Sequence, residues 1–332
     1  MVANAAIKFN EVHDEEFEKN FKENLLEKEI SDFSKEFQNQ PKKGSCPCCE
    51  SKNLETEFSC LGFDHSRCQD CDTLFIDPCP PEDRIIDFLN NSKAFALWRE
   101  MPEHVKKSRM KMYHERLAQV KSIIAEHSPK KENLRVLEIG SGNGEMAELM
   151  CEDDLFSEIH MIEPQELNLK HDKINLFRGS FAEFKKPGAV DVVISYEVLE
   201  HLVEPEDYFK LAQESLAPGG IFIFTTPNGD SLEIKVLQQK SPTVPFDHIR
   251  LYTPKALRNF MERFSFETLE LKTPGKFDVD IILRNGSKGP FAKEITLFED
   301  FLNQNEEFKQ SLQKFLVEKQ QSSHMVCVAK KK

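Results

Sequence analysis

Long apolar runs are missing from this 332-residue sequence, in which no stretch approaches the roughly 20 apolar residues that span a bilayer. The first 20 residues, MVANAAIKFNEVHDEEFEKN, are acidic and lack the apolar run of a secretory signal. These two absences predict a cytoplasmic protein with no membrane partner. In that compartment the nine cysteines indicate thiols or metal ligands, because disulfides are rare there.

Positive charge is also scarce. The chain has 44 Lys and Arg against 57 Asp and Glu, which gives a net charge of −13. An acidic surface repels phosphate backbones, and the sequence has no basic cluster beyond a short terminal AKKK. Nucleic acid is therefore not expected as a partner, and the sequence does not identify a partner protein.

Strand and helix patterns alternate from Leu134 onward. The helical patterns of this part follow Gly144 and cover residues 205–216, 254–264 and 291–320. Such alternation implies right-handed crossovers and a mostly parallel sheet, so we expect an α/β domain. The strand candidates, of which the last joins the sheet late in the chain, are residues 135–140, 158–164, 174–180, 191–197, 220–227, 267–274 and 323–331.

Three glycines lie in the segment EIGSGNG (residues 138–144), between the first strand candidate and a helix. Glycine lets a backbone turn tightly and approach a ligand closely. The spacing G-x-G-x-G differs from the G-x-G-x-x-G of dinucleotide-binding loops, and the sequence has no P-loop. Glu138, just before the loop, repels phosphates and suits a cationic ligand. Glu163, at the end of the next strand, is placed to accept hydrogen bonds from ribose hydroxyls.

A ligand with a ribose, a positive charge and no pyrophosphate matches S-adenosylmethionine. The segments VLEIGSGNG, IEP, DVVISYEVLEHL and LAPGGIFIFTTPN resemble, in this order, the motifs of class I S-adenosylmethionine-dependent methyltransferases. The resemblance covers roughly residues 134–273 and is closest to the ubiquinone-biosynthesis O-methyltransferases, which share an EVLEH-type segment. It implies a doubly wound, mostly parallel, seven-stranded Rossmann-like sheet.

The resemblance also implies roles for individual residues in binding the methyl donor. Glu138 and the glycine loop would hold the methionine end, and Glu163 would bind the ribose. Ser180 and Phe181 would border the adenine, although family members often have Asp at the position of Ser180. Tyr196 would lie beside the methyl group. The implied donor-binding residues are Glu138, Gly140, Ser141, Gly142, Gly144, Glu163, Ser180, Phe181 and Tyr196.

Two C-x2-C pairs precede this domain. Cys46 and Cys49 form the first pair, and Cys68 and Cys71 form the second pair after 18 intervening residues. This spacing predicts a tetrahedral thiolate site for Zn²⁺. Four protein ligands leave no open position, so the metal is expected to be structural. Cys48 is the alternative to Cys49 as a ligand.

We therefore expect four successive parts in the chain. A helical N-terminal segment (residues 1–44) precedes a zinc ribbon (45–80), a helical bridge (81–131) and the class I methyltransferase domain (132–332). A zinc ribbon before such a domain resembles the bacterial arrangement in sugar C-methyltransferases, which modify nucleotide-linked sugars and are typically longer than this chain.

Activation of the acceptor is predicted at YEVLEHL and PFDHIRLYTP. An oxygen nucleophile must lose a proton, either to a base or because a metal lowers its pKa. Glu197, Glu200, His201 and His248 could bind a divalent ion such as Mg²⁺, as in similar segments of ubiquinone-pathway and small-RNA 2′-O-methyltransferases. Alternatively, His201 or His248 acts as a base without metal, or these residues only brace the fold. The candidate catalytic residues are His201, His248, Glu197 and Tyr196.

These observations predict an enzyme that moves a methyl group from S-adenosylmethionine to a small molecule. A sugar or another cell-surface or secondary-metabolite precursor is the kind of acceptor expected. Two alternatives stay open at this point. One is a non-catalytic interaction module in which the ribbon recruits a partner and the second domain senses the cofactor. The other is an RNA or protein methyltransferase, of which the RNA version is disfavoured by the acidic charge.

Overall fold

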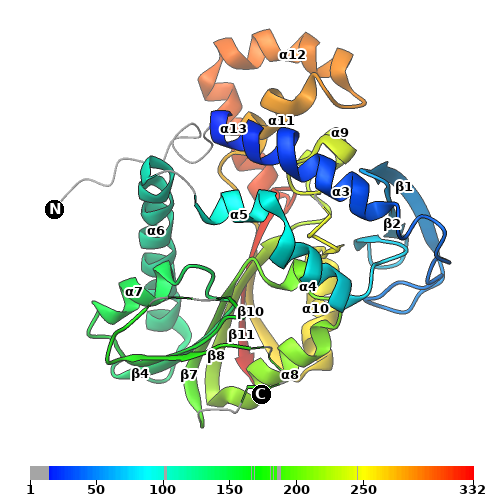
Figure 1. Ribbon diagram of the computed structural model, residues 1–332. Helices are drawn as coiled ribbons and strands as arrows, with labels where there is room; N and C mark the ends of the chain where they lie inside the picture. The colour runs from blue at the N-terminus through cyan, green and yellow to red at the C-terminus, as the bar shows by residue number, and fades with distance from the viewer. Residues whose placement is uncertain are drawn as a thin grey trace.

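The computed structural model describes residues 15–100, 103–165, 167, 169–179, 181, 183–184, 188–244 and 246–332. A large sheet with helices on both faces forms the main body, and a smaller sheet lies at one side of it (Figure 1).

The large sheet has seven strands in the order β10-β11-β8-β7-β4-β5-β6. The strands from β8 to β6 in this order pair in parallel, whereas β11 runs antiparallel to both of its neighbours. This topology confirms the doubly wound, mostly parallel α/β sheet. The strands are β4 (Leu134–Ile139), β5 (Phe156–Ile162), β6 (Ile174–Phe177), β7 (Val190–Tyr196), β8 (Leu216–Pro227), β10 (Phe266–Lys272) and β11 (His324–Lys331).

Helices cover both faces of this sheet, and further helices lie around it. The helices that follow the cysteine segment are α4 (Glu82–Asn91), α5 (Lys93–Arg99), α6 (Glu103–His127), α7 (Glu145–Cys151), α8 (Pro205–Ser215), α9 (Leu232–Leu237), α10 (Pro254–Arg263), α11 (Asp278–Gly286), α12 (Ala292–Gln304) and α13 (Glu306–Glu318), with short 3-10 turns η2 (Leu199–His201) and η3 (Gln238–Lys240). Helices α6 and α7 pack on one face, and α8 and α10 pack on the other (Figure 1).

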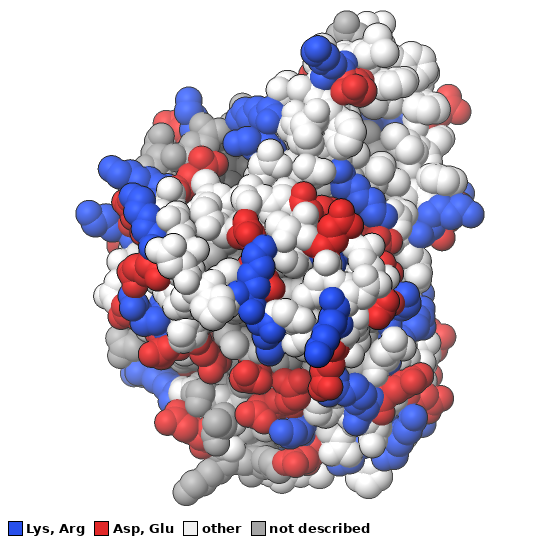
Figure 2. All heavy atoms as spheres, turned by 90° about the vertical axis from the view of Figure 1, so that its right-hand side faces the viewer, with Lys and Arg blue, Asp and Glu red and all other residues white. Residues whose placement is uncertain are grey.

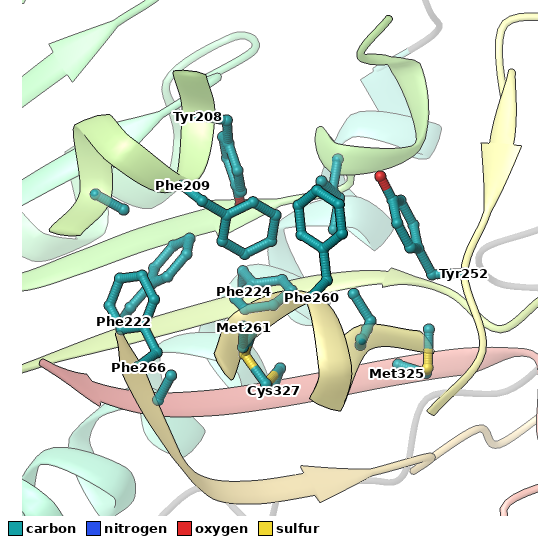
Figure 3. Close-up of a cluster of buried hydrophobic side chains, with 14 of the residues drawn as sticks. Tyr208, Phe209, Phe222, Phe224, Tyr252, Phe260, Met261, Phe266, Met325 and Cys327 are labelled. Carbon is teal, nitrogen blue, oxygen red and sulfur yellow. The ribbon is translucent and has the colours of Figure 1, made fainter. Parts of the chain in front are cut away.

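Alternating apolar side chains explain why these segments form strands that are buried on both faces. Val136 of β4 belongs to the core beneath α6 and α7, whereas Leu137 belongs to the core beneath α8 and α10. Figure 3 shows this second core, in which the rings of Phe222 and Phe224 from β8 lie near Phe209 of α8. Full burial of each such ring stabilises the fold by about 1.5–3 kcal/mol.

The smaller sheet contains three strands from residues 45–80, which we call the cysteine segment, and one strand from the main body. Its antiparallel order is β1 (Leu54–Cys60), β2 (Phe63–Cys68), β3 (Leu74–Ile76) and β9 (Arg250–Leu251). The amide of Ile76 donates a hydrogen bond of 3.0 Å to the carbonyl of Ile249. The cysteine segment is therefore joined to the main body by backbone pairing.

A threonine makes a second connection between the two parts. The hydroxyl of Thr253 donates to the carbonyl of Cys71 at 2.9 Å, and its oxygen also accepts the amide of Ala256 at 3.1 Å. The second bond caps the N-terminus of α10. One buried side chain thus links the cysteine segment to a helix of the main body.

The N-terminal helical segment covers the junction between the two sheets. It consists of α2 (Glu15–Glu18), the π-helical η1 (Lys19–Leu26) and α3 (Glu27–Ser34). The ring of Phe33 lies 6.3 Å from that of Phe63 in β2 and 5.0 Å from that of Phe246. Its apolar residues are therefore buried against both the cysteine segment and the loop that precedes β9.

Within the described residues, no helix has both the length and the apolar composition needed to cross a bilayer. Figure 2 shows the side of the molecule that carries the smaller sheet. Among the side chains coloured there, acidic and basic groups are interspersed, and acidic groups gather across the lower half. This face is in keeping with the net charge of −13.

Candidate functional site

The glycine loop adopts backbone conformations that only glycine takes without strain. Gly140, Gly142 and Gly144 have φ angles of 73°, 57° and 86°. A Cβ atom on Gly140 would lie 2.3 Å from Val198, and one on Gly144 would lie 2.1 Å from Leu169. A Cβ on Gly142 would meet nothing within 4 Å. The loop is therefore packed closely at both ends, and open space lies over its centre.

Glu163 follows β5 and is linked directly to this loop. Its carboxylate accepts hydrogen bonds from the amides of Gly142 at 2.9 Å and Gln165 at 3.1 Å. Burial raises the pKa of Glu163, and these two amides oppose the rise. The structure therefore brings Glu163 beside the glycine loop, as its predicted ribose-binding role requires.

Glu138 and Ser141 carry buried polar atoms without a partner. Glu138 is 3% exposed, and neither its Oε2 nor the hydroxyl of Ser141 has a hydrogen-bond partner among the described residues. Burial raises the pKa of Glu138 well above its ordinary value, and the nearby Glu145 and Glu163 raise it further. A buried acid among other acids is costly without a cation. This arrangement suits a ligand with an ammonium or sulfonium group.

Of the two residues predicted to border the adenine, the structure describes only Phe181. Ser180 lies outside the described residues. Phe181 is half-buried and packs against the core, with its ring 6.2 Å from that of Tyr208. The adenine-side role of both residues stays a prediction.

Tyr196 ends β7 on the sheet face that α6 covers. Its ring lies 4.8 Å from the guanidinium carbon of Arg116, which also lies 5.4 Å from the ring of Tyr113. Both neighbours come from α6, in the segment predicted as a bridge. The helix therefore contacts Tyr196 through Arg116.

Glu197 is held in a strained backbone conformation just after β7. Its φ angle is 54°, which is uncommon for a residue other than glycine and is often found at functional sites. Its Oε1 accepts the hydroxyl of Thr225 at 2.5 Å and lies 3.5 Å from Nδ1 of His324. Burial raises the pKa of Glu197, but His324, Arg116, Thr225 and His248 outweigh it, so the pKa is lowered.

Glu200, His201 and His248 form the strongest candidate for a divalent-ion site in the main body. One possible ligand atom from each lies within 4.8 Å of the others. Glu200 is completely buried, its Oε2 accepts the hydroxyl of Thr226 at 2.9 Å, and its Oε1 has no partner among the described residues. Glu197 does not belong to this group of ligand atoms, although it was predicted with it.

Backbone carbonyls determine how the two imidazole rings are oriented. Nδ1 of His201 lies 2.7 Å from the carbonyl of Asp247, and Nδ1 of His248 lies 2.9 Å from the carbonyl of Thr243. A carbonyl only accepts, so each Nδ1 carries the proton and each Nε2 has a free lone pair. This is the usual support of a metal-binding histidine, and it also suits a base.

Burial favours the neutral forms of Glu200 and His201 in this trio. Burial raises the pKa of Glu200 well above its ordinary value, and the charge of Glu197 adds to the rise. Burial lowers the pKa of His201, His248 lowers it further, and Asp247 opposes both.

The sequence did not single out several residues of this site. They are Tyr113, Arg116, Thr225, Thr226, Asp247 and His324. His324 is the first residue of β11, and it reaches Glu197 only because that strand inserts next to β8. Its position at the start of the last predicted strand was the available signal. Arg116 had no local signal, because the helical pattern around it does not show which face of the helix lies against Tyr196.

The four predicted cysteines converge at the edge of the smaller sheet. The sulfurs of Cys46 and Cys71 are 3.6 Å apart, those of Cys49 and Cys68 are 3.5 Å apart, and all four lie within 4.8 Å of one another. Zn–S bonds of about 2.3 Å in a tetrahedron place sulfurs about 3.8 Å apart. The amide of Cys48 points to the Cys46 sulfur at 3.4 Å. The donor set and spacing are consistent with a bound zinc ion.

Comparison with known proteins identifies a methyltransferase domain in the chain. Residues 112–271 match the model of a family described as a methyltransferase domain. This range includes the glycine loop, Glu163, Tyr196 and the Glu200–His201–His248 trio, but not the four clustered cysteines.

Individual relatives share only part of the chain. A protein of Mycolicibacterium smegmatis described as a "probable S-adenosylmethionine-dependent methyltransferase" is 30% identical over 138 residues, which cover 40% of this chain and 51% of the relative. A ubiquinone biosynthesis O-methyltransferase of a Caulobacter species is 32% identical over 108 residues, covering 29% and 42%. The chain thus spans about half the length of these relatives.

A similar fold occurs in the crystal structure of an S-adenosylmethionine-dependent methyltransferase from Mesorhizobium loti. It is 15% identical, with a TM-score of 0.40, and the match covers 61% of this chain and 93% of that one.

Proposed function

Because the chain contains a class I S-adenosylmethionine-dependent methyltransferase domain, we propose that it transfers a methyl group from S-adenosylmethionine to a small-molecule acceptor. Oε2 of Glu138, buried without a hydrogen-bond partner among the described residues, carries this proposal, together with the open space over Gly142. That carboxylate has no cation among the described residues, and the donor supplies one.

The donor site is assembled from three strand ends. Glu138 would bind the ammonium group, and the backbone of Gly140–Gly144 would lie along the methionine portion. Glu163 would exchange its bond from the Gly142 amide for the ribose hydroxyls. Tyr196 would cover the methyl group from the β7 side. Ser180 and Phe181 would border the adenine.

The reaction is an in-line displacement that depends mainly on alignment. A lone pair of the acceptor forms the new bond to the methyl carbon as the carbon–sulfur bond breaks. The bonding electrons stay on sulfur, which becomes the neutral thioether of S-adenosylhomocysteine. An acceptor hydroxyl also releases its proton, so a hydroxyl acceptor needs a group that receives it or acidifies it.

Glu200, His201 and His248 would provide that group. We propose that they hold a divalent ion. The adjacent Glu197 would take up a proton or accept a hydrogen bond from a water molecule. When bound, such an ion lowers the pKa of a coordinated hydroxyl. The free Nε2 positions of both histidines and the unpartnered Oε1 of Glu200 support this role. A metal-free base at His201 or His248 uses the same free Nε2 and is the alternative.

Cys46, Cys49, Cys68 and Cys71 would hold one structural Zn²⁺. Burial of four thiols without a metal stabilises so small a sheet only slightly. Zinc binding contributes directly to the free energy of folding. The close sulfur–sulfur distances support zinc at this position.

The alternatives are an RNA or protein methyltransferase and a non-catalytic interaction module. Supply of a methyl-labelled donor to an extract of the source cells distinguishes them. We expect label in the low-mass fraction, and none above background with the Gly142→Val variant. Label in RNA or protein instead would contradict a small-molecule acceptor, and donor binding without any transfer would favour the non-catalytic module.

A further inference from the structure

Two arginines of α6 lie beside the methyl-donor site without a carboxylate partner. Among the described residues, neither Arg109 nor Arg116 forms an ion pair within 4.0 Å, and Nε of Arg109 is buried without a hydrogen bond. This is unexpected in a chain with 57 acidic and 44 basic residues. Half-buried cations of this kind usually have a counter-ion.

Aromatic rings hold both guanidinium groups in place. Arg116 lies over Tyr196 at 4.8 Å and over Tyr113 at 5.4 Å. Arg109 lies over Trp98 at 5.4 Å and over Tyr113 at 6.0 Å. Stacking occupies the flat face of a guanidinium and leaves its N–H edge for an anion, which it can bind through two hydrogen bonds.

Each arginine lacks an ion pair among the described residues, so the two guanidinium groups can bind two separate anions. S-adenosylmethionine has one carboxylate, so it can neutralise one of the two arginines. Its ammonium group belongs with the buried Glu138, whose acidic neighbours are Glu145 and Glu163. One guanidinium is left over, and the acceptor is the remaining molecule that can neutralise it.

We propose that the acceptor carries a carboxylate or phosphate group that Arg116 binds, and that Arg109 binds the donor carboxylate. This inference rests on the proposed methyl transfer. Because Arg116 stacks on Tyr196 itself, the anionic group lies within a few bonds of the atom that is methylated.

The neighbours of each arginine support this assignment. Arg109 donates to the hydroxyl of Tyr113 at 3.4 Å, and Tyr113 is within electrostatic reach of Glu138 and Glu145 at the donor loop. Arg116 is within electrostatic reach of Glu197 and His324 on the acceptor side. The two residues are seven positions apart on one helix, about 10 Å along its axis, which separates the two anions.

The experiment uses the full chain saturated with S-adenosylhomocysteine. Acetate and inorganic phosphate are titrated separately at constant ionic strength, by calorimetry and by the emission of Trp98, the only tryptophan in the chain. We expect at least one of them to bind saturably, and the stronger of the two identifies the anion class. Arg116→Gln should weaken that binding at least tenfold, and Arg116→Lys should weaken it less.

The control variant is Lys107→Gln, which removes one positive charge from an exposed position of the same helix and should leave anion binding unchanged. Arg109→Gln should instead weaken S-adenosylhomocysteine binding at least tenfold. Three results overturn the proposal: no saturable anion binding, anion binding unaffected by Arg116→Gln, or loss of S-adenosylhomocysteine binding in Arg116→Gln but not in Arg109→Gln. Failure of the proposed function itself is separate, because the wild type then does not bind S-adenosylhomocysteine.

Discussion

Glu138 is the residue at which ligand binding and stability conflict most clearly. Burial raises its pKa well above the ordinary value of 4.5, so the folded protein keeps a proton that the unfolded chain releases. Below pH 4.5 both states are protonated and the residue has no effect on the free energy of unfolding. As the pH rises above 4.5 that free energy falls, and the whole loss is present above the folded-state pKa.

We therefore predict that Glu138→Gln melts at a higher temperature than the wild type at pH 8. The rise should be about 2–4 °C for each kcal/mol by which the free energy of unfolding increases. The difference should shrink as the pH falls toward 4.5. The same variant should bind S-adenosylhomocysteine at least tenfold more weakly, because the ammonium loses its counter-ion. Calorimetric scans and titrations test both parts. A variant that is less stable at pH 8 but binds normally would contradict this account of Glu138.

The histidines of the trio give a second prediction at this scale. His248→Ala should weaken Mn²⁺ binding at least tenfold, measured from the paramagnetic resonance signal of free Mn²⁺, because one of three ligands is lost. S-adenosylhomocysteine affinity should stay within about twofold. The matched control is His114→Ala, at an exposed position of α6, which should change neither. If the wild type does not bind Mn²⁺ and its activity survives chelation, the metal-free base is favoured.

Single residues were predictable from the sequence where the motif itself determines their place. Glu138 is the second-last residue of its strand, Tyr196 is the last of its own, and Glu163 directly follows a third strand. Parallel strands bring their carboxyl ends to one edge of the sheet. Arg116 and His324 reach the same place from a helix and from the last strand. Their positions depend on long-range packing, which local spacing does not encode.

Among the elements, β9 connects the two proposed metal sites. It begins two residues after His248 and pairs with β3, which begins three residues after Cys71. We predict that Cys71→Ser, which removes one zinc ligand, speeds amide exchange at Ile76 and in residues 250–251 at least tenfold. It should also weaken Mn²⁺ binding, because His248 loses its support, while the distant glycine loop keeps its S-adenosylhomocysteine affinity.

Cys60→Ser is the control for this experiment, because Cys60 is half-buried and outside the four-sulfur group. The Cys60→Ser protein should retain zinc, and its amide exchange at Ile76 and in residues 250–251 should stay as slow as in the wild type. Unchanged exchange in a zinc-free Cys71→Ser protein would show that the smaller sheet does not depend on the metal.

Elements were predicted more completely than the contacts between them. The seven strands of the large sheet could be recognised because period-two patterns and continuous apolar runs reflect burial on both faces. The two-residue β9 could not, because so short a strand has no pattern of its own and exists through its pairing with β3. The joining of the cysteine segment to the main body was missed for the same reason.

At the scale of the whole molecule, the net charge of −13 bears on the kind of partner. We predict no binding of a fluorescent 20-nucleotide RNA at 150 mM salt by anisotropy, up to about 10 μM protein, because few counter-ions can be released from such a surface. Micromolar binding with a steep salt dependence would contradict this prediction and favour a nucleic-acid acceptor.

The most direct test of the account is a calorimetric titration of the wild type with S-adenosylhomocysteine, beside Gly142→Val and NADH. We predict a one-to-one complex of micromolar affinity, no detectable binding to a folded Gly142→Val variant, and no binding of NADH. Saturable binding of NADH with no response to S-adenosylhomocysteine would contradict the account.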